Sequence, residues 1–304
     1  PRRQAGTEWA EFLPTTWGGA MDQPSSWLNP IRILEMIPMT YFNKNAELKQ
    51  GYNPYIDMSA DDMGTQMDVG LLVMEPGDVF TFEEAEKEIA VLLFAGTVTY
   101  QWAGKTVEAD RPDCFHHEAY CLLAGRGEKI TLTAKAHSEL YIQKTLNEKP
   151  FEAVMYTPDT VQTQHAGCNG ELLGCMEREI KTFFDHDNAP FSNMVLGEVL
   201  NHPGKWSSYP PHHHPQPEVY FYRFDYPHGF GAGFANGEIY QTGHNGLAVI
   251  TSGFHSQTAA PGYAMCYAWG IRHLEGDPWL KTRIDDEEHA WLWKPDANDH
   301  IYQG

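Results

Sequence analysis

The sequence predicts an all-β chain made of two β-sandwich or jelly-roll barrels behind an N-terminal arm. Short apolar strands recur along most of the chain, glycine or proline turns separate them, and one turn–loop–strand pattern occurs twice. The expected division is an arm over residues 1–50, a first barrel over residues 51–160, a connection over residues 161–193 and a second barrel over residues 194–304.

Composition and charge narrow the class of protein. The 304 residues are 42% hydrophobic and 13% aromatic, which is typical of a globular chain with a real core. The net charge of −20 opposes binding to nucleic acids or anionic membranes, and no apolar run reaches membrane-spanning length. The five cysteines form no CxxC pair, which favours free thiols in a reducing cytoplasm. We therefore expect a cytoplasmic protein with neither a nucleic-acid nor a membrane partner.

The N-terminal arm is rich in aromatic residues but lacks a lasting period. Trp9, Phe12, Trp17 and Trp27 are spread among prolines and glycines. An aromatic arm of this kind needs a surface to cover, either the body of its own chain or a partner subunit. We therefore expect a homo-oligomer, most simply a homodimer.

The first barrel is predicted from strands that alternate with turn signals. Ala95-Gly96 is expected to turn the chain between two of these strands. The predicted strands lie at residues 67–74, 79–82, 88–94, 97–102, 130–133 and 140–142.

A repeat relates the two halves. Pro76-Gly77 precedes a strand that opens with Glu88, and Pro203-Gly204 precedes a strand that opens with Glu218. Only the second half carries histidines before its glutamate, so we expect the first barrel to hold no metal ligands.

The histidines of the second half predict a metal site. Residues two apart on an extended chain share a face, so His212 and His214 point one way and His213 the other. Two prolines then place a turn before Glu218, which predicts a hairpin with imidazoles on one arm and a carboxylate on the other. His255 is the best candidate for a fourth ligand. Such a set suits one divalent zinc or manganese ion, and iron also fits.

Two plainer interpretations compete with the metal site. A proline-stiffened loop of solvated histidines would bind nothing physiological. His255 by itself is more typical of a core histidine, and only the neighbouring cluster makes it a candidate ligand.

Several motifs of the second half resemble the bicupin family of 5-deoxy-glucuronate isomerases, which serve myo-inositol breakdown. These motifs are Gly197-Glu198-Val199-Leu200, Trp206 to His212, Glu218 to Phe224, Ala260 to Tyr263 and His289-Ala290-Trp291. The wider group is similar to ketol-isomerases that act on 4-deoxy-5-keto-uronates. The resemblance implies an aldose–ketose isomerase that converts 5-deoxy-glucuronate, a sugar acid, to 5-dehydro-2-deoxy-gluconate.

That activity assigns expected roles to further residues. The substrate carboxylate needs a cation, for which Lys205, Arg178 and Arg272 are candidates. Arg223 follows Glu218 by an odd number of residues, so its side chain should point to the opposite face of the strand, away from the metal. The sequence does not show which group is the base that removes the C2 proton. Hydroxide on the metal is one candidate, and proton relay through tyrosines is the other, with Tyr209, Tyr220 and Tyr222 as the possible residues.

Two other classes of function fit the same ligands. Three histidines and a glutamate in a β-barrel also serve metal-dependent dioxygenases, which would consume oxygen. A sugar-binding protein with a structural metal would bind tightly without isomerising its ligand.

Overall fold

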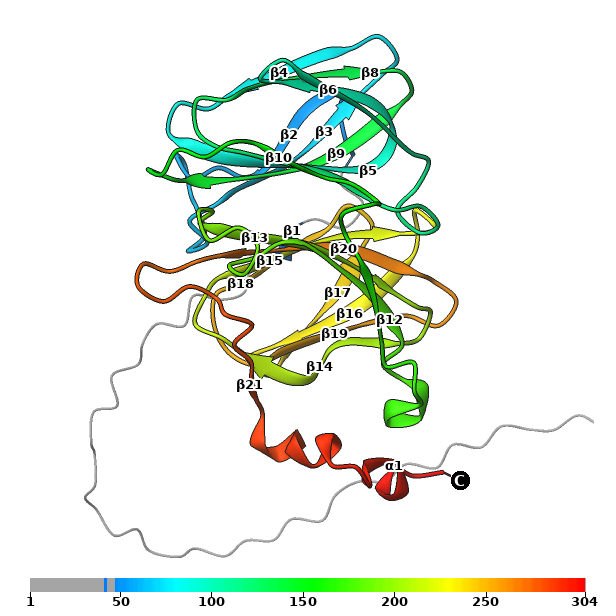
Figure 1. The fold of residues 1–304 in the computed structure, drawn as a ribbon. Helices are drawn as coiled ribbons and strands as arrows, with labels where there is room; N and C mark the ends of the chain where they lie inside the picture. The colour runs from blue at the N-terminus through cyan, green and yellow to red at the C-terminus, as the bar shows by residue number, and fades with distance from the viewer. Residues whose placement is uncertain (1–40, 43–46, 304) are drawn as a thin grey trace, which may run out of the picture. The chain divides into compact units, whose positions relative to one another are not determined.

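The computed structural model describes residues 41–42 and 47–303, and nearly all of its regular structure is β-strand (Figure 1). This confirms the all-β class. Most of the N-terminal arm, with its four tryptophan and phenylalanine residues, lies outside the described residues. None of the helices in the described part of the chain is long and apolar enough to cross a membrane.

The first barrel contains strands that are drawn from blue to green in Figure 1. Its strands form one nine-stranded sheet system, in which the path β10-β7-β5-β9-β3-β2 is extended by β4, β6 and β8. The strands are β2 (Gly51–Ile56), β3 (Asp68–Met74), β4 (Val79–Glu83), β5 (Lys87–Trp102), β6 (Lys105–Arg111), β7 (Tyr120–Ala124), β8 (Lys129–Ala134), β9 (Ser138–Leu146) and β10 (Val154–Tyr156).

Strand β5 closes this barrel by running through both of its faces. Its first half pairs with β7 and β9, and its second half pairs with β6 and β8. The register shifts between Leu93 and Ala95, and Gly96 adopts a φ of 112°, which an L side chain rarely allows. The predicted turn at Ala95-Gly96 is therefore wrong: the glycine bends one continuous strand from one face to the other.

The second barrel is built from two separate sheets. One has seven strands in the order β1-β18-β15-β20-β13-β12-β11, and the other has five in the order β17-β16-β19-β14-β21. The seven-stranded sheet contains β1 (Tyr41–Phe42), β11 (Thr163–Ala166), β12 (Arg178–Phe184), β13 (Met194–Asn201), β15 (Glu218–Phe224), β18 (Leu247–Ile250) and β20 (Met265–Arg272). The five-stranded sheet contains β14 (Trp206–His213), β16 (Phe230–Ala235), β17 (Glu238–Gly243), β19 (His255–Ala259) and β21 (Ile284–Asp285).

The predicted connection over residues 161–193 is part of the second barrel. Strand β12 pairs with β13, and β11 pairs with β12, so both extend the seven-stranded sheet. Arg178 and Ile180 thereby lie on a wall of the second barrel. Short helices flank the barrel: the 3-10 helices η1 (Glu171–Gly174) and η2 (Glu287–Trp293) and the α-helix α1 (Ala297–His300).

The two halves pack through a shared apolar core. Phe94 and Tyr141 of the first half contact Phe221 of the second, with ring centroids 5.8 and 5.7 Å apart. Arg111 of the first half also forms a fully buried ion pair with Glu198 of the second. Separate clusters of buried apolar residues fill the interior of each barrel.

The repeated glutamates do not occupy equivalent places. Ala90, Leu92 and Phe94, which share a strand face with Glu88, belong to the core between the halves. Glu88 accordingly accepts hydrogen bonds at this junction from Asn147 Nδ2 and from the Asn193 backbone N–H. The repeat is thus out of register by one residue, and the interior-facing position of the first barrel holds Ile89.

Candidate metal centre

Three imidazoles converge inside the second barrel. One ring nitrogen each from His212, His214 and His255 lies within 4.8 Å of the other two, and all three residues are buried. The Glu218 Oε2 atom joins them, 3.1 Å from His214 Nε2 and 3.4 Å from His255 Nε2. The structure therefore brings together the four residues that the sequence predicted as ligands.

These ligands come from both sheets of the barrel. Strands β14 and β19 are neighbours, and His212 pairs directly with His255. Glu218 instead opens β15 in the opposite sheet. The predicted hairpin is therefore wrong, because the proline-containing turn after His214 carries the chain from one sheet to the other. The parity prediction is confirmed: His213 is half-buried and packs against Phe254 outside the cluster.

The outer nitrogen of each imidazole faces a backbone carbonyl. The Nδ1 atoms of His212, His214 and His255 lie 3.2, 2.9 and 3.4 Å from the carbonyl oxygens of Ser208, Gln216 and Gly253, respectively. A carbonyl can only accept, so these contacts favour the tautomer with the proton on Nδ1. Each Nε2 lone pair is then left for the centre of the cluster, as in metal-binding histidines.

The electrostatics of the cluster also suit a cation. Burial is the main cause that lowers the pKa of His212 to about 2, with His255 and Arg283 adding to the effect. Burial alone would raise the pKa of Glu218, but the adjacent His214 and His255 imidazoles outweigh it and hold that pKa far below its usual value. Burial lowers the pKa of His214, but the Glu218 carboxylate outweighs burial and raises that pKa, so a metal ion would replace a proton between these two groups.

One atom of the cluster lacks a hydrogen-bond partner. The buried His255 Nε2 makes no hydrogen bond within the described residues. Buried polar atoms without a partner are rare, and a metal ion at the centre would satisfy this one. The donor set of three imidazoles and one carboxylate thus fits a divalent transition metal.

Two arginines face the same cavity as the ligands. A cavity of about 170 Å³ is lined by His212, His214 and Glu218, and also by Arg178 and Arg283. Arg178 donates to the Met176 carbonyl at 2.9 Å, and Arg283 Nε donates to Asp285 at 2.5 Å. Burial is the main cause that lowers the pKa of both guanidiniums. Arg283 lowers the pKa of Arg178 further, whereas Asp285 partly offsets the shift of Arg283.

Arg283 was missed by the sequence reasoning. It follows the last long strand, in a segment that returns to the barrel as β21 and pairs with β14. Its contribution depends on this pairing, for which the sequence has no periodic signal. The only local hint was the pair of basic residues, Lys281 and Arg283, before the acidic run that starts at Asp285.

The other two predicted cations lie elsewhere. Lys205 Nζ donates to the Gly174 carbonyl at 2.6 Å and pairs with Glu177 at 3.1 Å, outside the metal cavity. Arg272 lies one residue beyond Ile271 on β20, so its side chain points to the opposite face of the sheet. The structure therefore differs from the prediction that these two side chains bind the substrate carboxylate, because neither lines the cavity that holds the histidine cluster.

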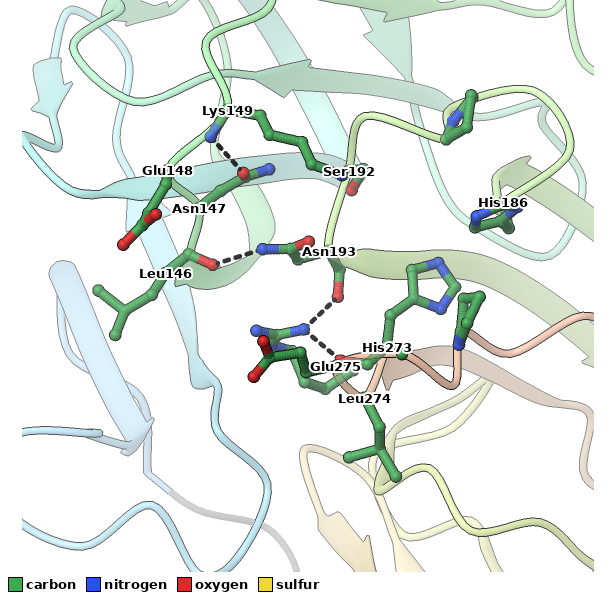
Figure 2. A pocket seen from close by; sticks show the side chains of 14 residues that line it. Leu146, Asn147, Glu148, Lys149, His186, Ser192, Asn193, His273, Leu274 and Glu275 are labelled. Atoms are coloured by element: carbon green, nitrogen blue, oxygen red, sulfur yellow. Dashed lines mark hydrogen bonds between the residues drawn. The ribbon is translucent and has the colours of Figure 1, made fainter.

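Arg272 instead lines a cavity of about 550 Å³ between the halves. Figure 2 shows this cavity, where Asn147, Lys149, Asn193 and His273 gather around it. Arg272 Nη1 donates to the Asn193 carbonyl of the same half at 3.1 Å, and Asn193 Nδ2 donates across to the Leu146 carbonyl of the first half at 2.9 Å.

The three predicted tyrosines have different surroundings. Tyr220 lines the metal cavity, and its hydroxyl lies 3.4 Å from Ser208 Oγ. Tyr222 lies deeper, where its hydroxyl donates to Gln257 Oε1 at 2.7 Å. Tyr209 packs with Trp206 and a satellite apolar cluster away from the ligands. Only Tyr220 of the three is placed at the cavity, together with the unpredicted Tyr267.

Comparison with known proteins agrees with this geometry. The model of the KduI/IolB family matches residues 41–292. The chain belongs to the KduI/IolB family. The 5-deoxy-glucuronate isomerase of Bacillus velezensis is 21% identical over 269 residues, which cover 81% of this chain and 95% of the relative. That of Lacticaseibacillus casei is 22% identical, over 84% of this chain and 98% of the relative.

Solved structures share the fold of this KduI/IolB family member. An IolB-like protein from Salmonella typhimurium LT2 superposes with a TM-score of 0.73 at 18% identity, over 83% of this chain and 98% of that protein. An oxalate decarboxylase variant from Bacillus subtilis superposes with a TM-score of 0.59 at 8% identity, over 86% of each chain. The two-barrel arrangement predicted from the repeat is seen in the sheet topology of this chain.

Proposed function

We propose that this chain is a metal-dependent aldose–ketose isomerase that converts 5-deoxy-glucuronate to 5-dehydro-2-deoxy-gluconate in inositol breakdown. The observation that carries the proposal is one cavity that combines a three-histidine, one-glutamate cluster with two guanidinium groups. Relatives that match nearly their whole length are named 5-deoxy-glucuronate isomerase.

His212, His214, His255 and Glu218 would hold one divalent metal per chain, most simply zinc or manganese, with iron also compatible. The bound metal would supply a Lewis acid that polarises the substrate carbonyl and acidifies the adjacent hydroxyl. The protein fixes the direction of each Nε2 lone pair through the carbonyl contacts of Nδ1.

The two arginines would bind the other end of the substrate. Arg178 and Arg283 each retain N–H donors beyond the backbone and Asp285 contacts described above. Guanidinium forks match the geometry of a carboxylate, and burial strengthens the pairing. Lys205 and Arg272 are left out of this proposal because neither reaches the cavity.

The isomerisation moves one carbon-bound proton between neighbouring carbons. Removal of the C2 proton and protonation of O1 give an enediol, and loss of the O2 proton with protonation at C1 then gives the ketose. Tyr220 would exchange protons with the substrate, and two contacts support this role: its side chain lines the cavity, and its hydroxyl lies 3.4 Å from Ser208 Oγ. Tyr222 would support Tyr220 through the interior of the barrel. Tyr209 packs against a separate apolar cluster and has no role in the proposed reaction.

Proton NMR in deuterated buffer tests the reaction. The metal-loaded protein should convert 5-deoxy-glucuronate with solvent deuterium entering at C1 as the ketose forms. Turnover of a 4-deoxy-5-keto-uronate alone would keep the isomerase class and replace the substrate. Oxygen consumption would favour a dioxygenase, and binding without turnover would favour a sugar-binding protein.

We further expect a cytoplasmic homodimer without nucleic-acid or membrane partners. The net charge of −20 and the five free cysteines support this expectation. Light scattering at micromolar concentration tests the dimer, and a monomer would contradict it.

A further inference from the structure

The chain returns to the metal-binding barrel after its last long strand. Strand β21 pairs with β14, where Asp285 is the partner of the ligand His212. The Asp286 N–H also donates to the Pro211 carbonyl at 3.0 Å, which ties the following residues to the same strand. Arg283 enters the metal cavity from this returning segment.

The Arg283 guanidinium is held on three sides. Its Nε atom donates to Asp285 Oδ1 at 2.5 Å, and its Nη2 atom donates to the Pro210 carbonyl. The ring of Trp293 lies against the guanidinium, with its centroid 5.4 Å from the Arg283 Cζ atom. The third nitrogen, Nη1, makes no hydrogen bond within the described residues, so it is the donor left for a ligand in the cavity.

Trp293 also fixes the acidic partner of Arg283. Its Nε1–H donates to Asp285 Oδ2 at 3.0 Å. The Asp285 carboxylate thus binds the indole through one oxygen and the guanidinium through the other. A single side chain therefore contacts both members of the ion pair, and its removal would loosen the guanidinium in two ways.

The position of Trp293 in the fold makes these contacts separable from packing. None of the seven residues of η2 is buried, and Trp293 itself is 54% exposed. The neighbouring Leu292 and Ala297 pack with the apolar cluster of Leu172 and Met176 and so hold this segment on the barrel without the indole. Replacing Trp293 should therefore remove its contacts with Arg283 and Asp285 and little else.

We propose that Trp293 is a positioning residue that holds Arg283 in place for the substrate carboxylate. This inference rests on the proposed function, in which Arg283 binds that carboxylate. A guanidinium that is already oriented loses less conformational freedom when it pairs with a ligand. The carboxylate takes no part in the isomerisation, so the pairing is equally strong in the bound substrate and in the transition state. Its weakening should raise KM and leave kcat unchanged.

The test replaces Trp293 in the metal-loaded protein. Trp293→Leu removes both contacts and should raise KM for 5-deoxy-glucuronate about threefold to tenfold, with kcat and metal content unchanged. Trp293→Phe keeps an aromatic face on the guanidinium but lacks the N–H donor, so its KM should rise only about twofold. In Arg283→Met protein, the added Trp293→Leu change should raise KM no further, because the indole acts through Arg283.

Trp291→Leu is the matched control. Trp291 lies on the same helix and is 38% exposed. In the described part of the chain, its side chain makes no hydrogen bond or cation–π contact with Arg283 or Asp285. Trp291→Leu therefore removes a similar apolar area from the helix and should leave KM unchanged.

The outcomes separate the two proposals. If the wild-type protein does not convert 5-deoxy-glucuronate, the proposed function fails and this inference falls with it. If it does, an unchanged KM in Trp293→Leu overturns the inference alone, as does an equal rise in Trp291→Leu or a further rise in the Arg283→Met background. If Trp293→Leu fails to fold, an unchanged KM in Trp293→Phe overturns it instead.

Discussion

The two barrels share an architecture but differ in what fills them. The interior of the first is an apolar cluster that includes Leu72, Ile89, Val91 and Leu122. The interior of the second combines apolar residues at one end with a buried set of imidazole, carboxylate, hydroxyl and guanidinium groups. A barrel of this kind is stable without polar residues inside it, so the histidine cluster is not needed to build the fold.

Two buried glutamates, one from each half, show the same contrast between the barrels in single residues. Glu88 and Glu218 each lie near the start of a long strand, and each is less than 5% exposed. Burial raises the pKa of Glu88 to about 7, because its partners are neutral amide and hydroxyl groups that offset burial only in part. His214 and His255 hold the pKa of Glu218 low instead. The partners of a buried carboxyl, and not its position on a strand, decide its charge.

The largest expected effect comes from removing a ligand in the second barrel. His214→Ala should release the metal and lower kcat/KM by about a thousandfold or more, since a Lewis acid contributes several kcal/mol to such a reaction. Elemental analysis and the isomerase assay measure both effects. His213→Ala, on the outer face of the same turn, should keep about one metal per chain. Metal loss in both variants would contradict the assignment of the two faces.

Removing a cavity arginine should have the next largest effect. Arg283→Met and Arg178→Met should each lower kcat/KM about tenfold to a hundredfold, mainly by raising KM, because a charge-assisted hydrogen bond to the carboxylate is lost. Steady-state kinetics on the metal-loaded proteins provide the measurement. Lys205→Met is the control and should leave KM nearly unchanged, since Lys205 pairs with Glu177 outside the cavity. If KM rose in Lys205→Met but not in the two arginine variants, Lys205 would be the cation that binds the carboxylate, as the sequence suggested.

Glu88 should make the stability of the protein depend on pH. Its folded pKa of about 7 lies above the ordinary value of 4.5, so its neutral form is favoured on folding. This contribution is fully present below pH 4.5 and is lost as the pH rises through 7, at a cost of about 3 kcal/mol. Glu88→Gln should therefore show a smaller fall in Tm between pH 5 and pH 8 than the wild type. Parallel Tm profiles would show that Glu88 does not titrate in this way.

The sequence predicts the strands and the ligands of the second barrel better than it predicts their surroundings. The His-x-His spacing and the strand that follows Glu218 determine to which face each side chain points, because side chains alternate along a strand. The pairing of β14 with β21, which delivers Arg283, joins residues more than 70 positions apart and leaves no local pattern. The bend at Gly96 and the one-residue offset of Glu88 were missed for a related reason: both depend on how the sheets pack.

The smallest effect is expected at the junction between the halves. Arg272→Met removes the guanidinium that donates to the Asn193 carbonyl, which should destabilise the protein by about 1 kcal/mol. Arg272 also lowers the pKa of Glu88, so its removal should push that pKa higher and move the pH-dependent loss of stability to higher pH. Thermal melts across pH 5 to 9 measure both changes. KM should stay unchanged because Arg272 faces the junction cavity, and a raised KM would mean that this cavity communicates with the metal centre.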